Sequence, residues 1–205
     1  MKLYYAKGAC SLAPHIIMSE LNMVYELELV DTKNKTCASG DFKKINPKGS
    51  VPALRMENGE ILTEGAVIDQ YLADQKMDST IFPKMGTIDR YRCMEWLNFI
   101  ATDLHKSYVP FFIGSMLTPT TATEISAFYS NMLSSKLDYV SEKLGTNEYL
   151  MGNNFTLADA YLFTVLSWSK HVNFDLNKWS NLRPYLERVG TRPAVIKAMK
   201  EEGLL

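Results

Sequence analysis

The sequence predicts an α/β domain followed by an all-helical domain, and three observations support this fold class. Strand and helix patterns alternate over about the first 75 residues, whereas the later part of the chain has helical patterns only. Between the two, residues 77–86 contain aspartate, serine, proline and glycine without periodicity. We therefore expect domains at residues 1–78 and 87–205, joined by a linker at residues 79–86.

The first expected elements are a strand at residues 2–5 and a helix at residues 12–21. This helix can contain Pro14 only if it begins near Cys10 or Ser11. The reason is that the N–H groups of a first helical turn have no acceptor inside the helix, so a proline loses nothing there.

A second strand is expected at residues 25–30, where apolar and acidic side chains alternate as in a half-exposed strand. Residues 52–56 and 61–63 should form a hairpin around Asn58-Gly59, a strong turn signal. A helix should follow at residues 66–72. The order is strand, helix, strand, a looser segment, two strands and a helix, which is that of a thioredoxin-like domain.

The second half of the chain predicts helices at residues 89–107 and 122–144, the latter ended by a glycine. A third helix, residues 157–172, is apolar nearly all round and should form the core of a helical bundle. Thr156 and Asp159 have the spacing of a capping box at its start. Two prolines stand where further helices could begin, namely Pro184 and Pro193.

Pro52 stands at the mouth of an apolar strand, a position that suits a residue without an N–H to give the sheet. An ordinary trans proline is one interpretation. If the bond between Val51 and Pro52 is cis, the N–H and C=O of Val51 turn outward and need partners. An extended peptide ligand could pair with them as an added strand does.

Composition excludes several classes of function. The net charge is −1, so we expect no attraction to nucleic acid or to an anionic membrane. No apolar run nears the roughly 18–20 residues of a membrane span, and the N-terminus lacks a signal-peptide pattern. The three scattered cysteines suggest free thiols in a reducing compartment such as the cytoplasm. The three histidines have no metal-ligand spacing and no phosphate-binding glycine loop occurs, so we expect neither metal nor nucleotide.

Together, the motifs of this chain resemble those of the cytosolic glutathione S-transferases, and more narrowly the bacterial beta class. They cover both halves in the right order, and their combination is far more specific than any one of them. The motifs are MKLYY with GACSLAPH, NPKGSVPAL, LTEG, EWLNF, LHK and FTLADAYLF. The resemblance implies the glutathione S-transferase fold, reduced glutathione as co-substrate and a homodimer.

The resemblance places the glutathione thiol at the start of the first helix. The ordinary pKa of such a thiol is roughly 8.5, and lowering it by about two units takes roughly 2.7 kcal/mol. A helix N-terminus supplies about 0.3–1 kcal/mol and one charge-assisted hydrogen bond about 1.5–3 kcal/mol, so the site needs both. Tyr5, Cys10 and Ser11 could each be the donor, and the beta-class resemblance points to Cys10. Without the resemblance, Cys10 could equally be a small buried residue.

The resemblance also implies where the peptide part of glutathione binds. The backbone of Val51 would pair with it, Glu64 would hold its ammonium group, and bare N–H groups at Gly65 would bind a carboxylate. Lys35 would pair with the glycyl carboxylate, although a solvated loop lysine is the simpler interpretation. Some transferases carry serine where Gly65 stands, so this chain would rely more on its backbone there.

Asn98, Thr102 and His105 fall on one stripe of the helix expected at residues 89–107. The resemblance places this stripe along the cleft between the domains. His105 would be a second donor near the sulfur and Lys106 an added positive charge, while Asn98 and Asp103 resemble positions that contact glutathione from the partner subunit.

We therefore expect a cytoplasmic, homodimeric glutathione transferase that joins the glutathione sulfur to small hydrophobic electrophiles, a detoxification activity, with Cys10 and His105 as catalytic residues. Cys10 could also form a mixed disulfide with glutathione, so this transferase could carry out thiol–disulfide exchange as well. Two alternatives remain open. A glutaredoxin-like enzyme would exchange disulfides through Cys10 alone, forming a mixed disulfide with glutathione, since residues 10–13 lack a second cysteine. A non-catalytic module that binds glutathione or a protein would keep the fold without the chemistry.

Overall fold

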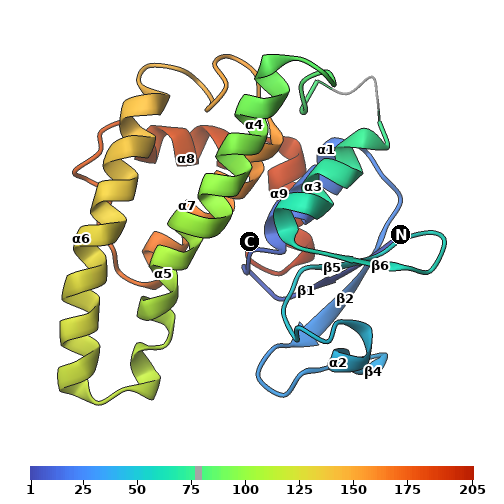
Figure 1. Cartoon of the computed structure of the whole chain (residues 1–205), viewed down its shortest axis with the longest axis horizontal. Helices are drawn as coiled ribbons and strands as arrows, with labels where there is room; N and C mark the ends of the chain where they lie inside the picture. The colour runs from blue at the N-terminus through green and yellow to red at the C-terminus, as the bar shows by residue number, and fades with distance from the viewer. Residues whose placement is uncertain (77–79) are drawn as a thin grey trace.

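The structure is a computed structural model that describes residues 1–76 and 80–205. A sheet with its covering helices forms one part of the molecule, and helices alone form the other (Figure 1). The C-terminus lies where the two parts meet, beside the sheet part (Figure 1).

The sheet has six strands in the order β4-β3-β2-β1-β5-β6. β1 and β2 run parallel, and the other neighbouring pairs are antiparallel. The predicted strands and hairpin are confirmed. The looser segment contains two short strands and one helical turn, α2 (Phe42–Ile45), which are too short to give a periodic signal. The strands are β1 (Lys2–Tyr5), β2 (Glu26–Asp31), β3 (Thr36–Cys37), β4 (Gly40–Asp41), β5 (Ala53–Arg55) and β6 (Ile61–Thr63).

Apolar side chains cover both faces of the central strand. On β1, Leu3 and Tyr5 belong to the main core with α1 (Leu12–Glu20) and α3 (Gly65–Asp74), whereas Tyr4 packs in a smaller cluster with α2. The first helix begins after Ser11, as predicted. Its N-terminus is thereby fixed at the carboxyl end of a buried strand.

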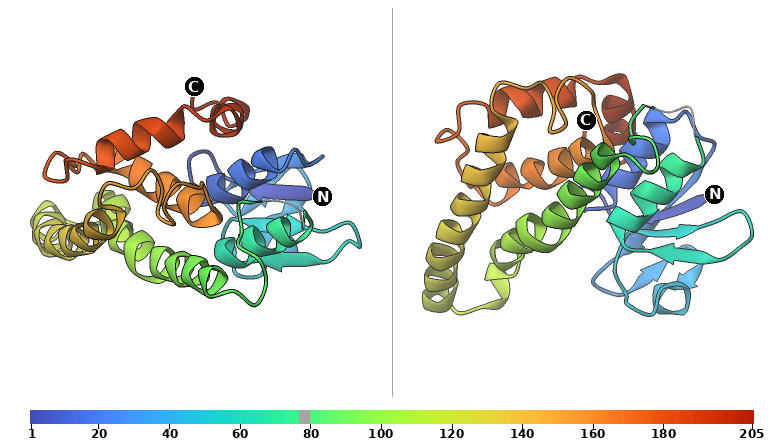
Figure 2. Two further views of the ribbon diagram at one scale, coloured as in Figure 1. Left: turned by 90° about the horizontal axis from the view of Figure 1, so that it is seen from above. Right: turned by 45° about the horizontal axis from the view of Figure 1, so that its top comes forward.

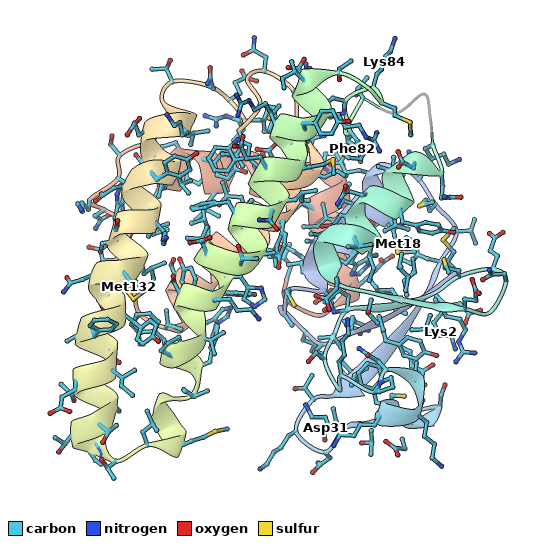
Figure 3. The ribbon with its side chains drawn as sticks, in the orientation of Figure 1. Lys2, Met18, Asp31, Phe82, Lys84 and Met132 are labelled. Carbon is cyan, nitrogen blue, oxygen red and sulfur yellow. The ribbon has the colours of Figure 1, made fainter. Side chains whose placement is uncertain are left out.

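β2 departs from a simple pattern of apolar inside and acidic outside. Leu29 is 48% exposed, whereas Glu28 is 6% exposed. Lys2, labelled in Figure 3, donates to Glu28 Oε2 at 3.0 Å, and the Ser39 N–H donates to Oε1 at 2.7 Å. Burial by itself would raise the pKa of Glu28, but the hydrogen bonds from Ser39 and Lys2 outweigh it and lower that pKa to about 2. Glu28 is therefore buried as a carboxylate.

We expect Glu28→Gln to reduce the free energy of unfolding near neutral pH by up to about 3 kcal/mol. The folded-state pKa lies below the unfolded value, so this stabilisation is present above about pH 4.5 and is lost as the pH falls toward about 2. Urea unfolding near pH 7 and near pH 3 measures it. Glu26→Gln, at an exposed glutamate of the same strand, is the control. A loss that stays equal at both pH values would contradict this assignment.

The helical part confirms the predicted helices, with shifted ends. Pro119 begins α6 three residues before the expected start, and Pro193 begins α9. Figure 2 shows α7 between a layer of α4 to α6 and a layer of α8 and α9. The helices are α4 (Ile88–Phe99), α5 (His105–Phe112), α6 (Pro119–Leu144), α7 (Leu157–His171), α8 (Leu182–Gly190) and α9 (Pro193–Glu201).

α7 is the core helix that its apolar sequence predicts. Twelve of its 15 residues are buried. The capping box is present, and the Thr156 N–H donates to Asp159 Oδ2 at 2.8 Å. The Thr156 hydroxyl donates to the same oxygen at 2.8 Å.

The helix expected at residues 89–107 is not one regular helix. It continues to Phe112, and a π-helical turn, η1 (Ile100–Leu104), separates α4 from α5. A short 3-10 turn, η2 (Gly114–Met116), follows. A π turn adds one residue to the hydrogen-bonded ring and so rotates the side chains beyond it. Spacing rules for an α-helix therefore fail across this segment.

The two parts share one continuous core of buried apolar side chains. α3 ends at Asp74 and α4 begins at Ile88, and Arg90 joins the two helices by donating to the Asp74 carboxylate at 2.7 and 2.8 Å. The predicted domain end at residue 78 and linker start at residue 79 lie outside the described residues. The boundary therefore stays a prediction. In the part of the chain that the structure describes, no helix is both long and apolar enough to cross a membrane.

Candidate active site

A cavity of about 520 Å³ lies where the turn before α1, the start of α3 and the η1–α5 segment meet. It lies between the sheet part and the helical part of the molecule. Most of the predicted site residues line it, namely Cys10, Lys35, Val51, Glu64, Gly65, His105 and Lys106.

Cys10 connects the first helix to the loop before β5. Its Sγ donates a hydrogen bond to the Val51 carbonyl at 3.3 Å. Burial raises the pKa of the Cys10 thiol to about 11, although its own backbone N–H and the charge of Lys106 act in the opposite direction. The group is therefore a thiol at neutral pH. It can donate a hydrogen bond, but it is a poor nucleophile in this state.

The other two candidate donors, Ser11 and Tyr5, are buried away from the cavity. The Ser11 hydroxyl is fully buried, accepts from the Ala6 N–H at 3.1 Å and donates to the Ala6 carbonyl at 3.2 Å. Tyr5 is buried in the core, and burial raises its pKa. Of the three, Cys10 is the one on the cavity wall.

The bond between Val51 and Pro52 is cis. The Val51 carbonyl is engaged by Cys10, whereas no acceptor for the Val51 N–H occurs within the described residues. Asn46 shapes this loop: it is 2% exposed and donates to the Ser50 carbonyl at 2.7 Å. Asn46 also lines the cavity, and sequence reasoning missed it, although its Asn-Pro turn signal could have found it.

Glu64 and Gly65 stand at the start of α3. Glu64 has a φ of 71°, a left-handed value that is uncommon for a residue with a side chain. Gly65 and Ala66 begin the helix on the cavity wall, so their N–H groups have no acceptor within the helix. Lys48, which the sequence did not single out, pairs with the Glu64 carboxylate. Both partners are exposed, so another cation can replace Lys48 at small cost.

The cavity favours an anionic ligand. Among the described residues, its lining has three lysines, Lys35, Lys48 and Lys106, and one carboxylate, that of Glu64. Lys35 donates to the Gly49 carbonyl at 2.9 Å, which holds its ammonium group on the wall.

His105 begins α5 and packs against two aromatic side chains of α7. The Tyr161 hydroxyl lies 3.0 Å from its Nδ1, and the Trp168 ring meets the imidazole edge-on with centroids 4.7 Å apart. Burial and then the charge of Lys106 lower the pKa of His105 to about 4, and burial raises the pKa of Tyr161. We infer that Tyr161 donates to Nδ1, because that phenol stays protonated and makes no other side-chain hydrogen bond among the described residues. Nε2 then carries a proton and is a donor.

Tyr161 also lines the cavity, although sequence reasoning did not propose it as a site residue. Tyr161 lies in the motif FTLADAYLF, which the sequence analysis identified. Its contact with His105 was not predictable, because it joins residues that are 56 positions apart.

Asn98 and Asp103 lie outside this cavity. Asn98 is exposed on α4, and Asp103 pairs with Lys136 of α6 at 2.6 Å. Of the expected stripe, Thr102 and His105 reach the cavity wall and Asn98 does not. The contact of Asn98 and Asp103 with a partner subunit stays a prediction.

Comparison with known proteins agrees with this geometry. Residues 8–75 match the family model described as "Glutathione S-transferase, N-terminal domain", and residues 130–193 match "Glutathione S-transferase, C-terminal domain". The chain is 42% identical over 205 residues to glutathione S-transferase GstA of Escherichia coli O157:H7, with all of both chains covered. The chain belongs to the glutathione S-transferase family.

Solved transferase structures share the fold over their full length. A sphingomonad glutathione S-transferase complexed with glutathione has a TM-score of 0.92 at 38% identity, covering 100% of both chains. The bacterial beta-class glutathione S-transferase of Sphingomonas chungbukensis has a TM-score of 0.92 at 39% identity, again covering 100% of both. Within the described residues, no group of metal-ligating side chains comes together in this transferase.

Proposed function

We propose that this chain is a glutathione transferase that ionises the thiol of reduced glutathione in the cavity and joins its sulfur to small hydrophobic electrophiles. The observation that carries the proposal is the convergence of Cys10, Val51, Glu64 and His105, from both parts of the molecule, on one cavity lined by lysines. The full-length similarity to GstA and to a transferase complexed with glutathione supports it.

Glutathione would lie across the start of α3. The backbone of Val51 pairs with the peptide, and the N–H groups at Gly65 and Ala66 bind the γ-glutamyl carboxylate. Glu64 exchanges Lys48 for the ammonium group, and Lys35 pairs with the glycyl carboxylate. No cofactor other than this co-substrate enters the proposal.

Thiol ionisation would draw on several sources. When glutathione binds, the Cys10 S–H would turn from the Val51 carbonyl to the forming thiolate, and the His105 Nε2–H would be a second donor to it. A donor to a charged group contributes about 1.5–3 kcal/mol. The N-terminus of α1 adds about 0.3–1 kcal/mol, and the charge of Lys106 acts in the same direction. Together these suffice for the roughly 2.7 kcal/mol that a shift of about two pKa units needs. The thiol proton passes to solvent. The thiolate then attacks the electrophilic carbon and forms the new C–S bond, while the leaving group departs with its electron pair, as chloride does from chlorodinitrobenzene.

The state of Cys10 favours conjugation over disulfide exchange. Exchange requires a Cys10 thiolate, whereas burial holds the pKa of this thiol at about 11. Conjugation requires Cys10 only as a donor, which the neutral thiol can be.

We further propose that the protein is a cytoplasmic, beta-class homodimer that serves in detoxification. The similarity to the Sphingomonas chungbukensis enzyme supports the class. In such a dimer, Asn98 and Asp103 would reach the partner's glutathione.

The test is turnover of chlorodinitrobenzene with glutathione, set beside glutathione-dependent reduction of a small disulfide. We expect Cys10→Ser to keep conjugation within about tenfold of the unaltered protein, because a hydroxyl can also donate. The same variant should lose any disulfide reduction. Cys37→Ser, outside the cavity, is the control.

The alternatives give different results in this test. Disulfide reduction without conjugation would establish the glutaredoxin-like function. Glutathione binding with neither activity would establish the binding module.

A further inference from the structure

Asp69 is a fully buried carboxyl group that the described part of the chain leaves without a partner. Its residue exposure is 0%, and neither Oδ1 nor Oδ2 has a hydrogen-bond partner within the described residues. Asp159 is just as buried, yet it accepts from Thr156, Leu150 and Tyr185. Buried polar groups normally have such partners, so an orphaned one needs an explanation.

Asp69 lies directly behind the wall of the cavity. It follows Gly65 and Ala66 by one helical turn on α3, and both of these residues line the cavity. Helical side chains lean toward the helix N-terminus, so the carboxyl leans toward that turn. The wall at these two positions has a hydrogen and a methyl group for side chains. A negative charge on Asp69 would raise the pKa of both Cys10 and Tyr161, which also line the cavity.

No cation among the described residues pairs with this carboxyl. On α1, His15 lies between Glu202 at 3.0 Å and Glu201 at 2.8 Å. On β5, Arg55 is exposed and donates to the Tyr4 hydroxyl at 3.1 Å.

The other titratable groups on the elements around α3 leave it equally uncompensated. On α7, Asp159 accepts hydrogen bonds from its own donors, and Tyr161 is uncharged. On α5, His105 is uncharged, and β6 contains no charged residue. Lys106, the remaining cation nearby, is exposed and acts on Cys10. Burial accordingly raises the pKa of Asp69 well above its ordinary value.

We propose that Asp69 is a positioning residue that must keep its proton while the glutathione thiolate occupies the cavity. The inference rests on the proposed function, since it concerns the same bound thiolate. An ionised Asp69 would lie behind the Gly65–Ala66 turn that binds the γ-glutamyl carboxylate. It would also repel the thiolate beside Cys10, because its charge disfavours a negative sulfur at that position. In the free protein, Asp69 can ionise as the pH rises. Binding of the thiolate then requires Asp69 to take one proton from solvent.

Because glutathione binding is coupled to protonation of Asp69, a change of pH should alter the affinity for glutathione but not the turnover rate. The glutathione KM should rise with pH, by at most about tenfold per unit, once Asp69 ionises in the free protein. The kcat should not follow, because the complex contains only the protonated form. Asp69→Asn cannot ionise, so its KM should stay level over the same range.

The experiment measures glutathione binding by calorimetry and KM by chlorodinitrobenzene turnover, from about pH 6 to about pH 9. Calorimetry in two buffers with different ionisation enthalpies should show proton uptake by the unaltered protein at alkaline pH and less uptake by Asp69→Asn. Asp69→Leu, which fills the same apolar site, gives a second variant if the amide folds poorly. Asp89→Asn, at an exposed carboxylate, should behave like the unaltered protein.

An equal rise of KM and equal proton uptake in the unaltered protein and in both Asp69 variants would overturn the proposal, as would a KM that is level in all of them. A protein that neither binds nor turns over glutathione would instead overturn the proposed function.

The pH dependence of folding stability tests the protonation of Asp69 even if the protein does not bind glutathione. The folded-state pKa of Asp69 lies above the unfolded value. Asp69 therefore does not lower the free energy of unfolding below about pH 4, and lowers it increasingly as the pH rises. The gain in stability of Asp69→Leu should therefore be larger at alkaline pH than at acid pH, and a gain independent of pH would show that Asp69 is not a buried neutral acid.

Discussion

Asp159→Ala is expected to reduce the free energy of unfolding by about 3–5 kcal/mol. The carboxylate is fully buried and accepts from the Thr156 N–H and hydroxyl at 2.8 Å, the Leu150 N–H at 2.9 Å and the Tyr185 hydroxyl at 3.0 Å. Alanine would leave these buried donors without an acceptor, at about 1–3 kcal/mol for each group that stays unpaired. Since α7 is the core helix of the bundle, the loss should affect the whole cooperative unit.

Urea unfolding measures this effect, with the midpoint read together with the slope. Asp89→Ala is the matched control, because it removes an exposed aspartate from the first turn of another helix and should change stability by less than about 0.5 kcal/mol. If Asp159→Ala and Asp89→Ala shifted the midpoint equally, the capping box would not be the anchor of this helix.

The second large effect is expected on catalysis. His105→Leu should lower kcat/KM for conjugation by about 10- to 100-fold, because it removes one donor to the forming thiolate. Burial and Lys106 hold the pKa of His105 at about 4, so the neutral imidazole is populated above that pH. We therefore expect no loss of rate from His105 titration between about pH 5 and about pH 9. An acid limb in this range should belong to the glutathione thiol.

Tyr161→Phe tests how His105 is held. Without the phenol, Nδ1 loses the partner that fixes its tautomer, and we expect kcat/KM to fall by about three- to tenfold. Tyr149→Phe removes a hydroxyl that accepts from Arg192 at 3.2 Å, far from the cavity lining, and should leave kcat/KM unchanged. Full activity in His105→Leu, or equal losses in the two tyrosine variants, would remove His105 from the mechanism.

Sequence reasoning reached the elements whose signals are local. The capping box at Thr156 and Asp159, the hairpin at Asn58-Gly59 and the apolar length of α7 each depend on neighbouring residues, and the structure contains all three. Reasoning by α-helical spacing failed at the π turn, because an inserted residue in a helix leaves no periodic trace. Of the stripe expected from that spacing, Thr102 and His105 line the cavity, whereas Asn98 lies outside it.

In the candidate site too, some features were predictable from sequence motifs and others only from the structure. Motifs indicated Cys10, Val51 and Glu64, but the pairing of Lys48 with Glu64 and the orphaned carboxyl of Asp69 were not visible. The capping-box spacing marked Asp159 as an acceptor, but nothing in the sequence shows that Asp69 is buried without donors among the described residues.

The order of the longer strands and helices and the family motifs follow from the chain alone, because each is set by propensity and spacing over a few residues. Which of Tyr5, Cys10 and Ser11 faces the cavity was decided only by packing, as were the protonated thiol of Cys10 and the neutral ring of His105. The physical reason is that burial and charge depend on distant segments, and these meet only when the sheet and the bundle close on one core.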